Sequence, residues 1–183
     1  MLWPFNRLGK SRTPPRGTIQ AIYGMIVAQA REPLFYQGLG VPDTVNGRFD
    51  MVVLHLWMVL RRLRLTADGT EVAQAVFDHF CADLDDNLRE MAVSDVAVPR
   101  RMKAFGEAFY GRSIAYDSAL AAGGDSLAQA LARNILNTED AAVGHPLADY
   151  VRAAISELDT TTPSALAAGD VRFPAPAGQK SMS

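Results

Sequence analysis

The longest apolar run in the chain lies between residues 51 and 60, where every residue except His55 is apolar. Crossing about 30 Å of hydrocarbon requires roughly 20 apolar residues, and this run is bounded by Asp50 and Arg61. It is too short to span a membrane, and no other stretch comes closer. We therefore interpret it as the central helix of a buried core, beginning at Asp50 and ending in arginines that suit the negative end of a helix dipole.

Elsewhere the apolar residues recur every three or four positions, which predicts amphipathic helices. These stripes fall within residues 19–31, 66–91, 100–120, 127–136 and 145–159. Residues 41–50 carry a proline, an asparagine and a glycine, and we expect them to form a loop that leads into the central helix. Long alternation of β-branched residues, which would indicate strands, is missing. The pattern predicts an all-α fold: a single-domain bundle of roughly six helices.

The two ends of the chain differ in composition from the helical part. Residues 1–17 are basic, contain no acidic residue and include three prolines, so we expect a flexible lead-in. Residues 161–183 are rich in Thr, Pro, Ala, Gly and Ser, which predicts a loosely ordered tail with at most one helical turn near residues 164–168. Residues 18–160 then form the helical domain.

Composition narrows the class of protein. The chain has 183 residues, of which 49% are hydrophobic and 21% charged, as in ordinary globular domains. A net charge of −2 gives no general attraction to nucleic acid, so a DNA partner is not expected. The single cysteine excludes an internal disulfide framework and fits a reducing compartment.

The residues that most often carry catalysis or bind metal stand alone here. His55, His79 and His145 lack the spacings of zinc sites. We expect His55 to be a neutral core residue bonded to a backbone carbonyl or a carboxylate. Cys81 follows Phe80 in an apolar stripe without an adjacent cation, which predicts a buried, unreactive thiol. No catalytic residue, metal ligand or cofactor is predicted.

The acidic cluster DLDD, residues 83–86, leaves one enzymatic alternative open. In all-helical isoprenoid synthases such carboxylates hold magnesium, and Asp83 and Asp86 could do so here. Those enzymes need a second acidic cluster on a facing helix, and the later helices offer only Asp117 and the pair at residues 139–140. A solvated, ion-paired helix face explains the cluster better.

Two segments fit binding to a partner. The helix within residues 100–120 opens with three cations, an arrangement that the helix dipole disfavours and that suggests function. The segment FYQGLGVPDTVNGRFD combines aromatic side chains with charges of both signs, as protein recognition surfaces do. The predicted partner-binding surface consists of Tyr36, Arg48, Arg100, Arg101, Lys103, Tyr110, Arg112 and Tyr116.

Several long motifs resemble one known family. They are IYGMIVAQAREPLFYQGLGVPDTVNGRFDMVVLHL, FDHFCADLDDNLREM, VSDVAVPRRMKAFGEAFYGR and AYDSAL, in this order. Together they resemble the ubiquinol–cytochrome c chaperone family, which includes mitochondrial assembly factors for ubiquinol–cytochrome c reductase and alphaproteobacterial relatives. The resemblance covers roughly residues 19–136 and leaves out the tail after Thr160.

The resemblance implies a non-enzymatic chaperone that binds nascent or newly inserted cytochrome b and assists assembly of the reductase. In its alphaproteobacterial form the protein would be cytoplasmic and peripheral on the cytoplasmic face of the inner membrane. Contact with the ribosome or an anionic membrane surface would accompany this role, and the need for a small second assembly factor stays open. The alternatives are the magnesium-dependent enzyme and a general adaptor that docks on ribosomes or membranes.

Overall fold

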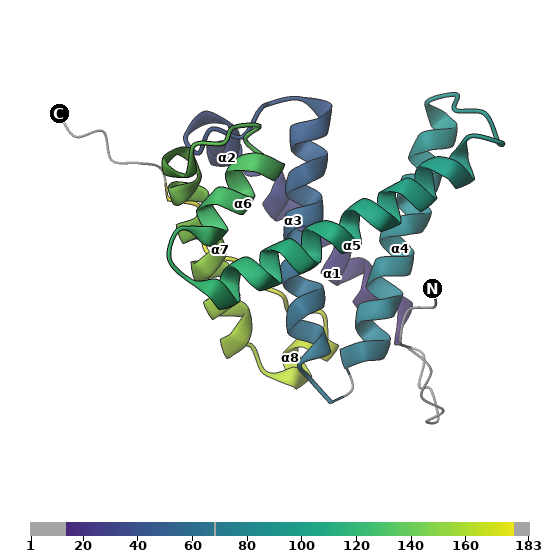
Figure 1. Ribbon diagram of the computed structural model, residues 1–183. Coiled ribbons are helices and arrows are strands. Elements are labelled where there is room, and N and C mark those ends of the chain that lie inside the picture. The colour runs from purple at the N-terminus through teal and green to yellow at the C-terminus, as the bar shows by residue number, and fades with distance from the viewer. Residues whose placement is uncertain (1–13, 68, 178–183) are drawn as a thin grey trace.

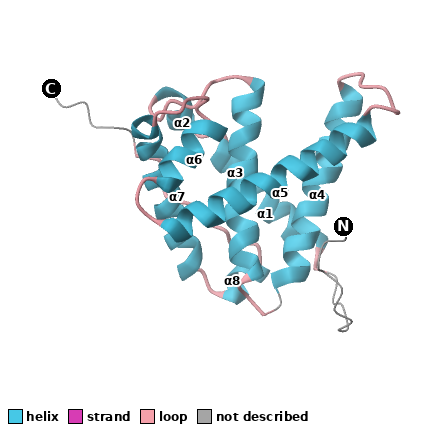
Figure 2. Cartoon of the chain, viewed as in Figure 1, coloured by secondary structure: helices cyan, strands magenta, loops and turns pink. Residues whose placement is uncertain are grey.

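The structure is a computed structural model that describes residues 14–67 and 69–177, and its regular elements in these ranges are all helices (Figures 1 and 2). Six of these helices have nine or more residues, and α2 and α8 have five. They are α1 (Arg16–Ala30), α2 (Pro33–Gln37), α3 (Val45–Arg64), α4 (Gly69–Glu90), α5 (Val98–Ala122), α6 (Ser126–Asn134), α7 (Ala141–Thr160) and α8 (Pro163–Ala167). The prediction of an all-α bundle is confirmed.

The central helix is α3, which packs against α1, α4 and α7 (Figure 1). All but one of residues 51–60 are buried on it, including His55. Because a helix that is apolar on every side must be covered on every side, this position follows from the sequence pattern. Within the described residues, none of the helices combines the length and the apolarity that a membrane span requires.

The start of α3 differs from the prediction. The helix begins at Val45 rather than Asp50, because the Thr44 hydroxyl accepts a hydrogen bond from the Gly47 N–H at 3.1 Å and caps the first turn. A Cβ atom at Gly47 would lie 2.0 Å from the Pro42 carbonyl oxygen, so only glycine allows this close approach. The expectation of a loop is therefore wrong for residues 45–50.

The start of α7 also lies upstream of the predicted one. Asp140 caps the helix by accepting from the Ala142 N–H at 2.9 Å, and Pro146, expected at the first turn, lies inside the helix. A Cβ at Gly144 would lie 2.1 Å from the Ala128 carbonyl oxygen, so the backbones of α6 and α7 approach each other closely. This packing positions the helix that carries Tyr150 into the core.

Residues 161–177, the described part of the segment after Thr160, pack against the helical body, whereas we expected a loosely ordered tail. Leu166 and Val171 are buried, and the Phe173 ring lies 5.1 Å from the His55 ring, centroid to centroid. The Gln29 side chain donates a hydrogen bond to the Pro174 carbonyl at 3.0 Å. Three well-spaced apolar residues thus anchor a segment whose composition resembles that of a linker. The predicted lead-in lies outside the described residues except for its last four.

The helices α4 and α5 meet at a turn formed by residues 91–97, which projects from the body (Figure 1). The start of α3 lies at the same end of the molecule, and α5 crosses α3 on its way back to α6 (Figure 1). The first residues of α3 and the last residues of α4 therefore lie apart from each other beneath the first half of α5 (Figure 1).

Candidate functional site

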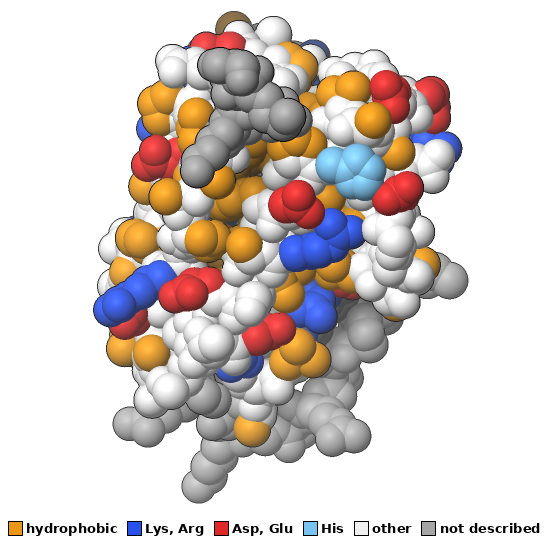
Figure 3. All heavy atoms as spheres, turned by 90° about the vertical axis from the view of Figure 1, so that its left-hand side faces the viewer, with side chains coloured by type: hydrophobic (Ala, Val, Ile, Leu, Met, Phe, Trp, Pro, Cys, Tyr) orange, Lys and Arg blue, Asp and Glu red, His pale blue; other side chains and the backbone are white. Residues whose placement is uncertain are grey.

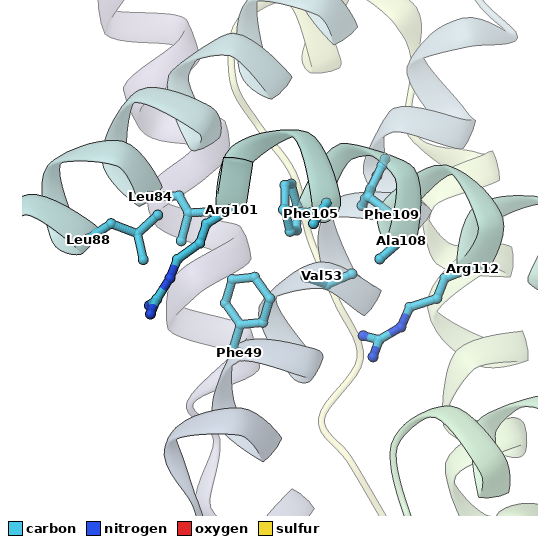
Figure 4. A pocket seen from close by; sticks show the side chains of 10 residues that line it. Phe49, Val53, Leu84, Leu88, Arg101, Phe105, Ala108, Phe109 and Arg112 are labelled. Atoms are coloured by element: carbon cyan, nitrogen blue, oxygen red, sulfur yellow. The ribbon is translucent and has the colours of Figure 1, made fainter. Parts of the chain in front are cut away.

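An apolar groove lies where α5 crosses the first half of α3 and the second half of α4, with a volume of about 320 Å³ (Figure 4). Its walls come from three helices. The lining residues are Phe49 and Val53 of α3, Leu84 and Leu88 of α4, and Arg101, Ala104, Phe105, Ala108, Phe109 and Arg112 of α5. Nearly all are apolar, as in sites that receive apolar side chains of a ligand or partner.

The floor of the groove is a cluster of aromatic rings. Phe105 lies 5.6 Å from Phe49 and 5.2 Å from Phe80, and it lies 6.0 Å from Phe109, all between ring centroids. Phe80 and Phe109 are buried, whereas Phe49 and Phe105 are partly exposed. The exposed rings are therefore fixed by buried ones, so the groove is formed before any partner arrives.

Two arginines border the groove. Arg101 and Arg112 are eleven residues apart on α5, which is three helical turns, so both lie on the face that lines the groove (Figure 4). Arg112 donates to Asp50 of α3 at 2.5 Å, and both side chains are partly buried. This pair fixes the crossing of α5 over α3. Arg101 is exposed and makes no ion pair with any described residue.

Two further cations and one tyrosine of the predicted surface on α5 lie outside the groove. Arg100, Lys103 and Tyr110 are all exposed, and none of them lines it. Lys103 is 3.9 Å from the Glu107 carboxylate on the outer face of the helix. The predicted surface on α5 is therefore divided between two faces of one helix.

Tyr36 and Arg48 form a separate pair near the start of α3. The Arg48 guanidinium lies over the Tyr36 ring, 5.6 Å from its centroid, and contacts Asp43 at 2.7 Å. The Tyr36 hydroxyl donates to the Ala30 carbonyl at 2.5 Å, and burial raises the pKa of this phenol. These contacts close the loop between α2 and α3, and neither residue lines the groove.

Tyr116 is misplaced in the predicted surface. Its side chain is 1% exposed and packs on Trp57 of α3, with ring centroids 5.1 Å apart. Beyond the groove, this part of α5 packs against the core, so Tyr116 contributes to packing and not to the surface. Phe49, Leu84, Leu88 and Phe105 line the groove but are not part of the predicted surface, although the stripes of α4 and α5 contain three of them.

His55 lies in the core, as predicted. Its Nδ1 donates to the Met51 carbonyl at 2.7 Å, so its Nε2 must accept from the Tyr150 hydroxyl at 2.7 Å. Gln29 donates to the same hydroxyl at 3.1 Å. Burial lowers the pKa of His55 to about 4, so the ring is neutral.

The acidic cluster on α4 is used in local contacts. Asp83 accepts from the Tyr23 hydroxyl at 2.7 Å, and Asp85 pairs with Arg89 at 2.6 Å. Among the described residues no three His, Cys, Asp or Glu side chains come together where they could hold a metal ion. Cys81 is half-buried, and burial raises the pKa of its thiol to about 11.

A preformed apolar groove bordered by arginines, on a helical bundle, is an architecture typical of proteins that bind a partner. The chain belongs to the ubiquinol–cytochrome c chaperone family, whose model matches residues 37–173. The resemblance of the motifs is thereby confirmed, and the match extends past Thr160 to residue 173. The family is one of chaperones rather than enzymes.

Related proteins carry consistent names. The chain is 30% identical over 129 residues to the ubiquinol–cytochrome-c reductase complex assembly factor 1 of Xenopus laevis, covering 69% of this chain and 64% of that protein. Identity to the Homo sapiens protein is also 30%, over 69% of this chain and 43% of that one. The chain therefore spans about half the length of the curated relatives it matches.

One solved structure shares most of the fold. It is the crystal structure of the Cbp3 homolog from Brucella abortus, with a TM-score of 0.78 and 38% sequence identity. The match covers 87% of this chain and 90% of that one. The helical arrangement described above is thus similar to that of a solved structure.

Proposed function

We propose that this protein is a chaperone in the assembly of ubiquinol–cytochrome c reductase, respiratory complex III, and that its client is newly made cytochrome b. Membership of the chaperone family and the names of the relatives support the assembly role. The aromatic groove between α3, α4 and α5 carries the proposal for this chain, because it offers a client a preformed apolar surface.

The chemistry of the groove suits an apolar segment of the client. Phe49 and Phe105 offer ring faces, Leu84 and Leu88 offer adaptable aliphatic contacts, and no carboxylate lines the groove. Arg101 at the border can pair with an acidic residue that flanks the apolar segment. The groove thus favours a segment that is apolar in the middle and acidic at one end.

The site of action that we propose is the cytoplasmic face of the inner membrane, where the protein would be peripheral. Newly made cytochrome b becomes accessible there as it leaves the ribosome and enters the bilayer. A small second assembly factor or the ribosome could join this complex, and the groove leaves most of the surface free for such contacts.

A groove-filling variant tests the proposal. Ala104 and Ala108 are exposed on α5 and line the groove, so Ala104→Trp/Ala108→Trp should fill it without disturbing the buried core. Ala121→Trp, at an exposed position of the same helix outside the groove, is the matched control. Each variant is expressed in the natural host after the host's own copy of the gene has been deleted.

We expect the deletion to lose assembled reductase, measured as the b-type haem spectrum and the native-gel band of the complex. The wild type and Ala121→Trp restore both, whereas the groove-filled variant does not and no longer co-purifies cytochrome b, although its melting temperature is unchanged. An intact reductase in the deletion strain would refute the assembly role. Co-purification of cytochrome b with the groove-filled variant would refute the groove as the client site.

A further inference from the structure

The turn between α4 and α5, residues 91–97, carries two exposed apolar side chains at the projecting end of the molecule. Met91 is 63% exposed and Val96 is 76% exposed. Isolated exposed apolar residues are common on proteins, but these two lie together on a turn that extends away from the body (Figure 1).

The turn is held in a defined conformation. Ala92 has a φ of 58°, and its N–H and that of Val93 bond to the carbonyls of Arg89 and Leu88 at 3.0 and 3.1 Å. This hydrogen-bond pattern is a Schellman motif, which ends a helix with one left-handed residue. Val98 at the start of α5 is fully buried and anchors the other side of the turn. The apolar side chains therefore point outward from an ordered structure.

Both signs of charge flank the turn, and in the part of the chain that the structure describes its unpaired cations lie on the α5 side. Residues 89–103 contain four cations and two carboxylates. Arg89 is neutralised by Asp85 at 2.6 Å and by Asp95 at 2.5 Å. Among the described residues Arg100 and Arg101 make no ion pair, and Lys103 has only an exposed partner at 3.9 Å. Three cations next to the turn are thus available to an anionic partner.

We propose that the α4–α5 turn docks this protein on a bilayer that contains anionic phospholipid. Met91 and Val96 enter the interface between headgroups and acyl chains, while Arg100, Arg101 and Lys103 contact lipid phosphates. An RNA partner fits less well, because residues 87–103 contain no aromatic side chain on which a base could stack. Two apolar side chains are also too few for the core of a stable protein interface.

This docking would also orient the groove. The start of α3, where Val45 is 80% exposed, lies at the same end of the molecule as the α4–α5 turn (Figure 1), and residues near the start of α3 and the end of α4 line the groove (Figure 4). On the side of the molecule away from the α4–α5 turn, acidic and basic side chains are interspersed (Figure 3). The inference rests on the proposed peripheral location and names the surface that would provide it.

Vesicle binding by the purified full-length chain tests the proposal. We expect it to sediment with vesicles that contain about 30% phosphatidylglycerol and not with pure phosphatidylcholine vesicles, and to be released by salt. Arg100→Gln/Arg101→Gln/Lys103→Gln should weaken binding by roughly a hundredfold, at about fivefold per cation. Met91→Ser/Val96→Ser should weaken it by roughly tenfold.

Two control variants match these changes elsewhere on the surface. Arg133→Gln/Arg152→Gln/Arg172→Gln removes the same net charge from exposed positions away from the turn. Leu65→Ser removes an exposed apolar side chain, 66% exposed, at the far end of α3. Both should bind vesicles as the wild type does.

Several results would overturn the proposal. The proposal is wrong if the wild-type chain stays in the supernatant or if the turn variants bind as well as the wild type. It is also wrong if the two triple cation variants lose binding equally. Salt-sensitive sedimentation with ribosomes, lost in the turn variants without any vesicle binding, would assign the surface to RNA instead. The assay contains no cytochrome b, so its outcome is independent of whether the client proposal stands.

Discussion

Protonation of His55 should destabilise the protein by a predictable amount. The ring is fully buried between α3 and α7, and its pKa is lowered to about 4 by that burial. A proton on Nε2 would remove the acceptor of the Tyr150 hydroxyl hydrogen and would place two donors, this N–H and the Gln29 amide, on the same oxygen. The folded state therefore resists a charge that the unfolded chain accepts readily.

The size of the effect follows from the two pKa values. An unfolded histidine has a pKa near 6.5, so between pH 6.5 and pH 4 the unfolded chain binds a proton that the folded chain excludes. The contribution to stability is fully present above pH 6.5, decreases as the pH falls and levels off below pH 4. A shift of this size corresponds to about 3 kcal/mol of unfolding free energy.

Urea unfolding from neutral pH to about pH 4, for the wild type and His55→Gln, isolates this term. Glutamine can donate and accept at similar positions but does not titrate, so both proteins share the losses that arise from carboxylates. We expect the wild-type free energy of unfolding to fall by about 3 kcal/mol more than that of the variant. Parallel curves, or an NMR titration of the buried imidazole near its unfolded pKa, would refute this account.

Three further predictions concern helix packing, the α4–α5 turn and the reactivity of the single thiol. Gly144→Ala places a Cβ 2.1 Å from the Ala128 carbonyl oxygen, so chemical denaturation should show a loss of about 3 kcal/mol, whereas Gly106→Ala, with open space around it, should gain about 0.5 kcal/mol. Ala92→Gly relieves a left-handed conformation at φ 58° and should raise the unfolding free energy by about 1 kcal/mol; a loss would mean that the turn is not held in that conformation. Cys81, with a pKa raised to about 11, should react about a hundredfold more slowly with a thiol reagent at mildly alkaline pH than an exposed cysteine does.

The central helix shows what the sequence pattern can and cannot determine. Apolar residues on all sides of positions 51–60 require burial, and α3 is buried there. The start of the helix depends on one cap and one close contact: the Thr44 hydroxyl and the space left by Gly47 under the Pro42 carbonyl. The sequence correctly showed turn-forming residues before the central helix, but a capped helical start and a loop use the same residue types.

The candidate site shows the same limit at the level of side chains. Tyr110 and Tyr116 both looked suited to recognition, but only Tyr110 is exposed. Tyr116 continues the apolar stripe of Phe105 and Phe109, so the periodicity alone placed it inward. The groove could not be located from any one helix, because it depends on how far α3 and α4 diverge beneath α5.

The size of the groove constrains how this chaperone could handle a membrane protein. At about 320 Å³ it is near the lower end of pockets that hold small molecules, so it accommodates a few side chains of one segment. A single transmembrane helix needs roughly 20 apolar residues, far more than the groove can cover. A client such as the one proposed would therefore keep most of its apolar surface in the bilayer while one segment occupies the groove. Lipid contact at the α4–α5 turn would hold the groove at the membrane surface, where such a segment emerges.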